Sequence, residues 1–253
     1  MVTLAQPTTA ADTLRAKALE VHRRLCHLYG CPIAYFHSLD PLSELVSSLL
    51  SHRTRNADSG RAFKEVRRRF PDWAAVATAP EPAVQDAIAG VTWPEQKAPR
   101  IQEVLRAVHA TCGEWSLNFL GDVPVPEARA WLEALPGVGP KTSAAVLSFS
   151  TLRRAALPVD SHHHRVAART GLIGSKLAVG PSHAVLAGQL PPDWDAQQLY
   201  DNHEVLMLHG QRCCFFQKPA CGRCVLLDLC PYGQRLQESA PDATPPSDPV
   251  GES

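Results

Sequence analysis

The chain has 253 residues, of which 45% are hydrophobic and only 6% aromatic, and equal numbers of basic and acidic residues leave no formal net charge. A chain of this length can bury one large core or two smaller ones. Its apolar residues are mainly Ala, Leu and Val without β-branched alternation, which indicates an all-α fold. No run of 18 uncharged apolar residues occurs, so we expect no membrane span. The segment from Met1 to Ala11 has neither a basic region nor an apolar core, so we expect no secretory signal.

The two ends differ in composition from the rest of the chain. Residues 1–12 and 237–253 are rich in Pro, Ala, Thr and Ser, and we expect both to be disordered tails. The segment 238–253 is acidic and has no Lys or Arg, so residues 1–237 carry a net charge of +4. A modest basic surface on the folded part is therefore compatible with a nucleic-acid partner.

The predicted elements are short helices separated by proline-rich turns. The first is expected from about residue 13 to residue 29. The second has a clear start at Asp40-Pro41, since a side-chain N-cap followed by proline is a typical helix beginning. Further helices continue to about residue 120, and no internal repeat or strand is expected. Apolar residues at helical spacing mark one of them: Ile101, Val104, Leu105 and Val108.

Residues 126–150 are expected to form two helices joined by a tight hairpin, with the second helix beginning at Pro140. Glycines in the turn permit positive φ and close approach of another backbone. The unpaired N–H groups at a helix N-terminus form an anion site that fits a DNA phosphate, although Pro140 removes one donor. An ordinary helical hairpin is the alternative, but LPGVG directly before a helix favours DNA contact. The predicted contact residues are Gly137, Val138 and Gly139.

Four cysteines near the C-terminus have the spacing C-x6-C-x2-C-x5-C. A loop this compact can surround one small inorganic core, which favours a [4Fe–4S] cluster. Structural zinc more often uses two close cysteine pairs set further apart, and free thiols or disulfides are the remaining alternatives. Without a secretion signal we expect a reducing compartment, where thiols bind metal rather than pair. The predicted ligands are Cys214, Cys221, Cys224 and Cys230, to the exclusion of Cys213.

These motifs together resemble the endonuclease III family, which comprises helix-hairpin-helix DNA glycosylases with an iron–sulfur cluster. The resemblance covers about residues 13–236. It rests on motifs that occur in the family's order: LPGVG-x-K at 135–141, VDSHHHR at 159–165, LHG at 208–210 and the four-cysteine loop.

The resemblance also implies an architecture and a partner. We expect a two-lobed helix-hairpin-helix glycosylase fold, in which a helical barrel-like domain at 41–155 ends in the hairpin. Residues 13–40 and 156–236 would form the iron–sulfur cluster domain. The implied partner is double-stranded DNA with damaged or abasic sites, bound across the groove between the lobes by a monomer. We expect a cytoplasmic protein that is nucleoid-associated through DNA.

Lys141 and Asp160 match the family's catalytic pair. A lysine just after a helix start is ordinarily a solvated side chain or a phosphate contact, but the positive end of a helix favours the neutral amine. Such an amine can attack C1′ of a deoxyribose and form a Schiff base. Asp160 can stabilise the sugar cation and move protons, and it can also cap the helix that follows. The resemblance thus implies a bifunctional glycosylase and abasic-site lyase acting on oxidised pyrimidines.

Other matches to the family are weaker. Glu133 matches an acidic residue of the family before the hairpin, and Arg165 matches an arginine after the aspartate. The resemblance implies that both support the active site, and a solvated helix carboxylate is the alternative for Glu133. Lys218 and Arg223 lie within the cysteine loop, where the family uses basic residues on phosphates and where plain surface charge is the alternative. Residues 162–164 are consecutive histidines, which point about 100° apart on a helix and are not expected to bind one ion.

One segment departs from the family pattern. Relatives carry a Ser-x-Gln-x-x-Asp-like segment after the second helix, whose glutamine helps fill the gap left by the flipped base. Here Ser51 is kept, whereas Arg53 stands at the glutamine position and Asn56 at the aspartate position. An arginine can also fill the gap, by stacking and by bonding the orphaned base. A DNA-binding protein of the same fold with weak or lost glycosylase activity therefore remains an alternative. A third hypothesis is a redox or metal sensor with the cluster as its functional centre, but the hairpin and the pair of Lys141 and Asp160 argue against it.

Overall fold

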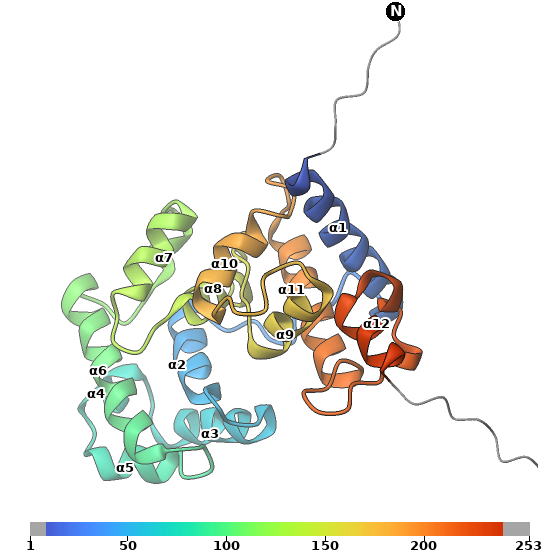
Figure 1. Ribbon diagram of the computed structural model, residues 1–253. Coiled ribbons are helices and arrows are strands. Elements are labelled where there is room, and N and C mark those ends of the chain that lie inside the picture. Colours follow the sequence, from blue (N-terminus) through green and yellow to red (C-terminus); the bar gives the residue numbers. More distant parts are fainter. Residues whose placement is uncertain (1–8, 240–253) are drawn as a thin grey trace, which may run out of the picture.

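The computed structural model describes residues 9–239, in which all regular secondary structure is helical. The all-α prediction is confirmed for this range. None of its helices is long and apolar enough to span a bilayer. Figure 1 shows the helices grouped in two bodies, one containing α2 to α7 and the other containing α1, α11 and α12.

The first body follows one continuous stretch of chain, whereas the second combines the N-terminal helix with the C-terminal part. Its helices are α2 (Pro41–Ser51), α3 (Asn56–Arg69), α4 (Trp73–Thr78), α5 (Glu81–Ala87), α6 (Pro94–Cys112), η1 (Asn118–Gly121), α7 (Val125–Glu133) and α8 (Pro140–Phe149). The second body contains α1 (Ala10–Tyr29), α9 (Ser161–Thr170), α10 (Val179–Ala187), α11 (Ala196–Arg212), η2 (Cys221–Arg223), η3 (Leu227–Leu229) and α12 (Pro231–Glu238).

The buried apolar residues divide in the same way. The largest cluster contains only residues between 42 and 156. Two other clusters combine α1 with residues between 157 and 226. A small fourth cluster joins the bodies, because Ala145 and Phe149 of α8 pack against Tyr200 of α11. The change of cluster after residue 156 supports the expected domain boundary, which stays a prediction.

The start of α2 follows the sequence prediction. Asp40 is its N-cap and Pro41 its first residue, and Oδ1 of Asp40 accepts hydrogen bonds from the backbone N–H groups of Leu42 at 3.1 Å and Ser43 at 3.0 Å. These bonds satisfy two of the amide donors that a helix start leaves unpaired. The cap therefore fixes where the polar and apolar faces of α2 point.

The expected tail boundaries need correction. The first helix begins at Ala10 because Thr9 and Asp12 form a capping box, in which Thr9 Oγ1 accepts from Asp12 N at 3.1 Å and the Asp12 carboxylate accepts from Thr9 N. A disordered tail at 9–12 is therefore wrong. At the other end α12 extends to Glu238, so 237–238 are helical. Residues 1–8 and 240–253 of the expected tails lie outside the described residues.

The expectation that no cysteines pair is also wrong at one place. Cys26 and Cys31 form a disulfide at the end of α1. Gly30 ends this helix with φ of 82°, and the reversal brings the two Cα atoms to 4.9 Å, within the usual range for a disulfide. The other cysteines of the described range are free thiols.

Candidate active site

The hairpin between α7 and α8 has a tight turn that requires glycine at one position. Gly137 has φ of 77°, and a Cβ added there would lie 3.1 Å from Cδ of Arg100. Gly139 has extended backbone, so the expected positive φ occurs at Gly137 and not at Gly139. No side chain caps α8, which leaves amide donors of its first turn free for an external acceptor. Val138 is buried in the core beneath the turn.

Lys141 at the start of α8 and Asp160 just before α9 line the same cavity. This cavity has a volume of about 400 Å³ and lies where α2, α3, α8 and α11 meet. The expected catalytic pair is thus brought together by two different helix starts. The remaining lining residues are Phe36, His37, Glu44, Ser47, Ser48, Ser51, Asn56, Ser59, Gly60, Phe149, His203, Glu204 and Met207.

The surroundings of Lys141 favour its neutral amine. Burial lowers its pKa, and the carboxyl groups of Glu44, Asp160 and Glu204 act in the opposite direction. The positive end of α8 disfavours the ammonium as well. Because only the neutral amine carries a free electron pair, this environment suits a nucleophile better than a surface lysine would.

Asp160 caps α9 while it faces the cavity. Its Oδ1 accepts a hydrogen bond from the backbone N–H of His163 at 2.7 Å, and the helix begins at Ser161. The cap fixes the position of the carboxyl at the cavity wall. Both roles that the sequence left open for this residue are therefore compatible with one geometry.

Of the polar face of α2, sequence reasoning singled out only Ser51, as possible support for the active site, and missed the other three residues. Glu44, Ser47, Ser48 and Ser51 are spaced i, i+3, i+4 and i+7, and all four line the cavity. Ser48 Oγ donates to Glu44 Oε1 at 3.0 Å, and Ser51 Oγ donates to the backbone carbonyl of Ser48 at 2.8 Å. Nε2 of His37 lies 3.0 Å from Glu44 Oε2. The same spacing rule that marked the apolar stripe at residues 101–108 could have found this polar stripe.

Glu204 on α11 was also missed. Its side chain is 7% exposed, and it lines the cavity together with Lys141 and Asp160. Burial, with smaller effects from Asp160 and Asp201, raises the pKa of Glu204 to about 7. Its carboxyl is therefore partly protonated near neutral pH, unlike an ordinary glutamate.

A second cavity, of about 520 Å³, contains the segment that departs from the family pattern. Arg53 and Trp93 both line it and both have positive φ, 51° and 57° respectively. The guanidinium carbon of Arg53 lies 5.9 Å from the centroid of the Trp93 ring, within range of a cation–π contact. Gly137 of the hairpin lines the same cavity. Two exposed planar groups are thus presented beside the hairpin turn.

Lys97 anchors the loop that contains Arg53. Its side chain is buried, and Nζ donates to the backbone carbonyls of Leu50 and His52 at 2.7 Å each and to Thr54 Oγ1 at 2.9 Å. These acceptors lie at the end of α2 and on either side of Arg53. The ammonium therefore satisfies carbonyls that the helix end leaves unpaired.

Glu133 and Arg165 both make structural contacts. Glu133 Oε1 accepts from Ser143 Oγ at 2.6 Å and from Arg129 at 3.1 Å, which ties α7 to α8, and it is not among the residues that line the cavity. Arg165 donates from Nε to the backbone carbonyl of Cys214 at 2.9 Å and from Nη2 to that of Gly210 at 2.7 Å. It thereby anchors the beginning of the cysteine loop on α9.

The four predicted ligand cysteines line one small cavity of the second body, together with Cys213 and His209. The backbone N–H groups of Leu226 and Gly233 point at Sγ of Cys224 and Cys230, both at 3.4 Å. A further group is compact enough for a metal ion, since the ligand atoms of His209, Cys213 and Cys224 lie within 4.8 Å of one another. The structure therefore contains a Cys/His group that could bind metal.

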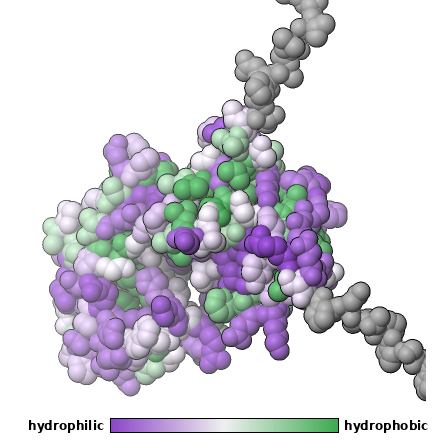
Figure 2. Space-filling model, viewed as in Figure 1, coloured by the Kyte–Doolittle hydropathy of each residue, from purple (hydrophilic) through white to green (hydrophobic). Residues whose placement is uncertain are grey.

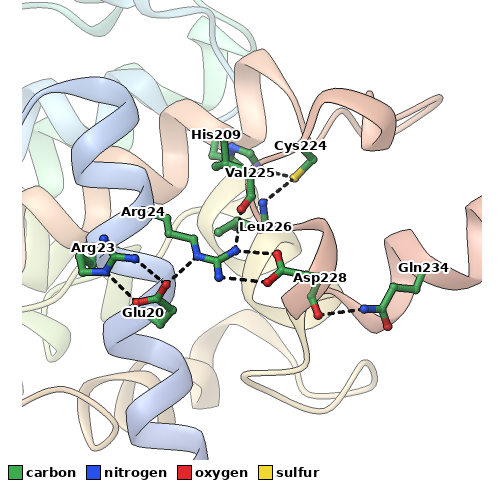
Figure 3. Close-up of polar contacts among 9 residues, drawn as sticks. All are labelled: Glu20, Arg23, Arg24, His209, Cys224, Val225, Leu226, Asp228 and Gln234. Atoms are coloured by element: carbon green, nitrogen blue, oxygen red, sulfur yellow. Dashed lines mark hydrogen bonds and ion pairs between the residues drawn. The ribbon is translucent and has the colours of Figure 1, made fainter.

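Charged contacts hold the cysteine loop against α1. Figure 3 shows Arg24 of α1 reaching the carboxylate of Asp228 at 2.6 Å and the backbone carbonyl of Val225 at 3.0 Å. Lys218 and Arg223 are exposed on the same loop, and Arg223 donates to the backbone carbonyl of Arg212 at 3.0 Å. Both basic side chains are thus accessible from solvent.

A family model described as HhH-GPD superfamily base excision DNA repair protein matches residues 46–182. This range contains the hairpin, Lys141, Asp160 and the three serines of the α2 wall of the cavity, but not Glu44. The match places the chain in the HhH-GPD superfamily of base excision DNA repair proteins.

Individual relatives narrow this class further. Endonuclease III of Escherichia coli K12 is 30% identical over 222 residues, which cover 88% of this chain and 98% of that protein. Endonuclease III of Thermotoga maritima is 30% identical over an alignment that covers 78% of this chain and 85% of that protein. A trapped endonuclease III–DNA covalent intermediate has the same fold, with a TM-score of 0.73, 23% identity and coverage of 90% and 99%. The chain belongs to the endonuclease III family within the HhH-GPD superfamily.

Proposed function

We propose that this chain is a bifunctional enzyme of base excision repair, a DNA glycosylase and abasic-site lyase acting on oxidised pyrimidines. The observation that carries the proposal is the position of Lys141 beside Asp160 in the wall of a cavity of about 400 Å³. Burial favours the neutral amine of Lys141, which is the nucleophilic form. Its relatives named endonuclease III support the same assignment.

In this mechanism the damaged base leaves the stack and enters the cavity, because C1′ is out of reach in a closed duplex. Nζ of Lys141 attacks C1′ while Asp160 stabilises the positive charge that develops on the sugar. Departure of the base leaves a Schiff base between Lys141 and the opened sugar. Loss of a proton from C2′ then breaks the 3′ C–O bond by β-elimination and cuts the strand.

The DNA would lie across the two bodies. Figure 2 shows a hollow between them, with hydrophilic residues beside it. The first turn of α8 would take a phosphate next to Gly137 and Gly139, while Arg53 and Trp93 would fill the gap left by the flipped base. Lys218 and Arg223 would contact phosphates from the cysteine loop. We infer that the protein acts as a monomer on damaged or abasic double-stranded DNA in the cytoplasm.

We infer that Cys214, Cys221, Cys224 and Cys230 hold a [4Fe–4S] cluster. The residues present fit such a group, since backbone N–H donors point at two of the sulfur atoms, as expected around anionic ligands. A Cβ at Gly233 would lie 3.6 Å from Sγ of both Cys221 and Cys230, so the glycine leaves space beside them. When bound, the cluster supplies a rigid frame for the basic loop and takes no part in bond cleavage.

Borohydride trapping tests the catalytic assignment. The protein is mixed with a duplex containing one abasic site, and borohydride is added. The amount of covalent protein–DNA complex is then measured for wild type, Lys141→Gln and Lys176→Gln. Lys176 is an exposed lysine away from the cavity and serves as the matched control. A band that is lost only in Lys141→Gln supports the imine mechanism. A wild type that binds the duplex without forming a band would instead identify a DNA-binding protein without activity.

A further inference from the structure

Glu204 has no role in the mechanism above, although it shares the cavity with Lys141 and Asp160. Three carboxyl groups line this cavity in the described part of the chain. Asp160 is engaged as a helix cap, and Glu44 accepts from Ser48 and lies against His37. The side chain of Glu204 makes no hydrogen bond with a described residue, and its pKa is shifted by burial and by nearby charges. A carboxyl that faces a reaction cavity without a protein partner is free to act on a group bound there.

The groups around Glu204 leave it free to exchange a proton. Asp160 and Asp201 favour its neutral form, whereas Lys141 favours its charged form. Asp201, one turn earlier on α11, is itself engaged, since Oδ1 accepts from Ile33 N at 2.8 Å and from Gln197 at 2.9 Å. The titratable or charged groups near Glu204, counted over all packed elements, are Lys141, Asp160, Asp201, Tyr200, Glu44, His37 and His203.

We propose that Glu204 is the proton donor to the departing base in the excision step. The inference rests on the proposed function, because it assigns a step of that reaction. A base leaving as an anion is a poor leaving group, and a carboxylic acid inside the base-binding cavity can supply the missing proton in place. Lys141 cannot do this while it serves as the nucleophile, and Asp160 must stay charged to stabilise the sugar.

The step balances in protons and electrons. The electron pair of the C1′–N bond moves onto the base nitrogen, which takes the proton of Glu204 and leaves as a neutral base. The lone pair of Lys141 Nζ forms the new bond to C1′. The C1′–O4′ bond then breaks as the nitrogen of Lys141 forms a double bond to C1′, and one of the two ammonium protons passes to O4′ while the other is lost to solvent. Glu204 regains its proton from solvent, so the step needs no oxidant, reductant or other co-reactant.

The proposal separates two activities that share Lys141. A duplex that already contains an abasic site has no base to protonate, so imine formation there does not need Glu204. We therefore compare base release from duplexes containing thymine glycol or 5,6-dihydrouracil, under single turnover, with borohydride trapping on an abasic duplex. The proteins are wild type, Glu204→Gln, Glu204→Asp and Glu114→Gln. Glu114 is an exposed glutamate outside the cavity and serves as the control.

The expected result is a selective loss of excision. Glu204→Gln should release base about 100-fold more slowly below neutral pH, and should lose the decline that wild type shows as pH rises through about 7. Trapping on abasic DNA should stay within about threefold of wild type, well below the loss expected for removal of a proton donor. Glu204→Asp should recover part of the release rate, and thermal unfolding checks that each variant is folded.

Three results would contradict the proposal. Unchanged base release and pH profile in Glu204→Gln would show that the carboxyl donates no proton. An equal fall in release and trapping would indicate a structural role. A wild type that traps on abasic DNA but releases neither base would remove the excision step, and with it both this inference and the glycosylase half of the proposed function. Wild type without any trapped band would contradict the proposed function alone if base release still followed Glu204.

Discussion

Oδ1 of Asp160 accepts a hydrogen bond from the backbone N–H of His163 at 2.7 Å, so the carboxyl that faces the cavity also begins α9. A substitution at this residue therefore changes two properties, the stability of the helix start and the charge in the cavity. The two can be separated, because asparagine caps helices about as well as aspartate but carries no charge.

We expect the free energy of unfolding of Asp160→Asn to lie within about 0.5 kcal/mol of the wild-type value. Asp160→Ala should be less stable than wild type by about 1 kcal/mol, the usual cost of a lost helix cap. Both variants should lose most excision activity, because neither can stabilise a sugar cation. Urea unfolding and single-turnover base release measure the two effects. Full activity in Asp160→Asn would show that the cap is the only role of this residue.

Lys97 is expected to be essential for the shape of the Arg53 loop. Lys97→Met removes an ammonium that serves three acceptors and leaves two backbone carbonyls buried without a donor. We expect a loss of about 2–4 kcal/mol of unfolding free energy, in the range for unsatisfied buried polar groups. The exposed Lys64→Met is the control, with an expected change within about 0.5 kcal/mol. Equal stability of the two variants in urea would contradict this account.

Part of this site could be predicted from sequence because local rules determine it. The Asp40-Pro41 start, the LPGVG turn and the pairing of Lys141 with Asp160 were all readable. These features depend on neighbours in the chain or on a motif that preserves them. The first helix begins earlier than expected because Thr9 and Asp12 form a capping box, which the sequence analysis did not take into account.

Glu204 and Lys97 were not predicted because their environment comes from tertiary packing. Glu204 lies in a helix where polar and apolar residues mix, and nothing local distinguishes it from a surface carboxylate. Only the approach of α8, with Lys141, and of the segment before α9, with Asp160, makes it a cavity residue. Lys97 likewise becomes an anchor only because the end of α2 lies beside α6. The positions of charged side chains relative to distant parts of the chain could therefore not be predicted from the sequence.

Arg53 and Trp93 should act together on DNA that lacks a base. Both line the cavity beside the hairpin, and the guanidinium lies 5.9 Å from the ring. We expect Arg53→Ala and Trp93→Ala each to weaken binding to a duplex with a stable abasic analogue by about 1–2 kcal/mol, in line with lost stacking. Fluorescence anisotropy at fixed salt provides the dissociation constants. A double variant whose effect equals the sum of both would show that the residues bind independently.

Metal binding should distinguish the two neighbouring cysteines. We expect Cys214→Ser to abolish the broad visible absorbance of the cluster at about 400 nm, and Cys213→Ser to retain it. The compact group of His209, Cys213 and Cys224 gives the opposite expectation, because it contains Cys213 and not Cys214. Iron and sulfide analysis of both variants decides between the sets. Zinc in place of iron in wild type would overturn the cluster assignment itself.

The raised pKa of Glu204 predicts how stability changes with pH. Its pKa is about 7 in the folded protein, whereas an ordinary glutamate has a pKa of 4.5, so between these values the folded state binds more protons than the unfolded state. The stability associated with the neutral carboxyl is therefore fully present below about pH 4.5 and is lost as pH rises through about 7. Glu204→Gln removes this dependence, since glutamine does not titrate.

We accordingly expect Glu204→Gln to be more stable than wild type at pH 8, by up to about 3 kcal/mol, and the difference to shrink toward zero near pH 4.5. Urea unfolding of both proteins across this range provides the comparison, and Glu114→Gln should follow wild type throughout. A constant difference at all pH values would mean that Glu204 ionises normally. Because this measurement needs no substrate, it tests the protonation of Glu204 independently of whichever base the enzyme removes.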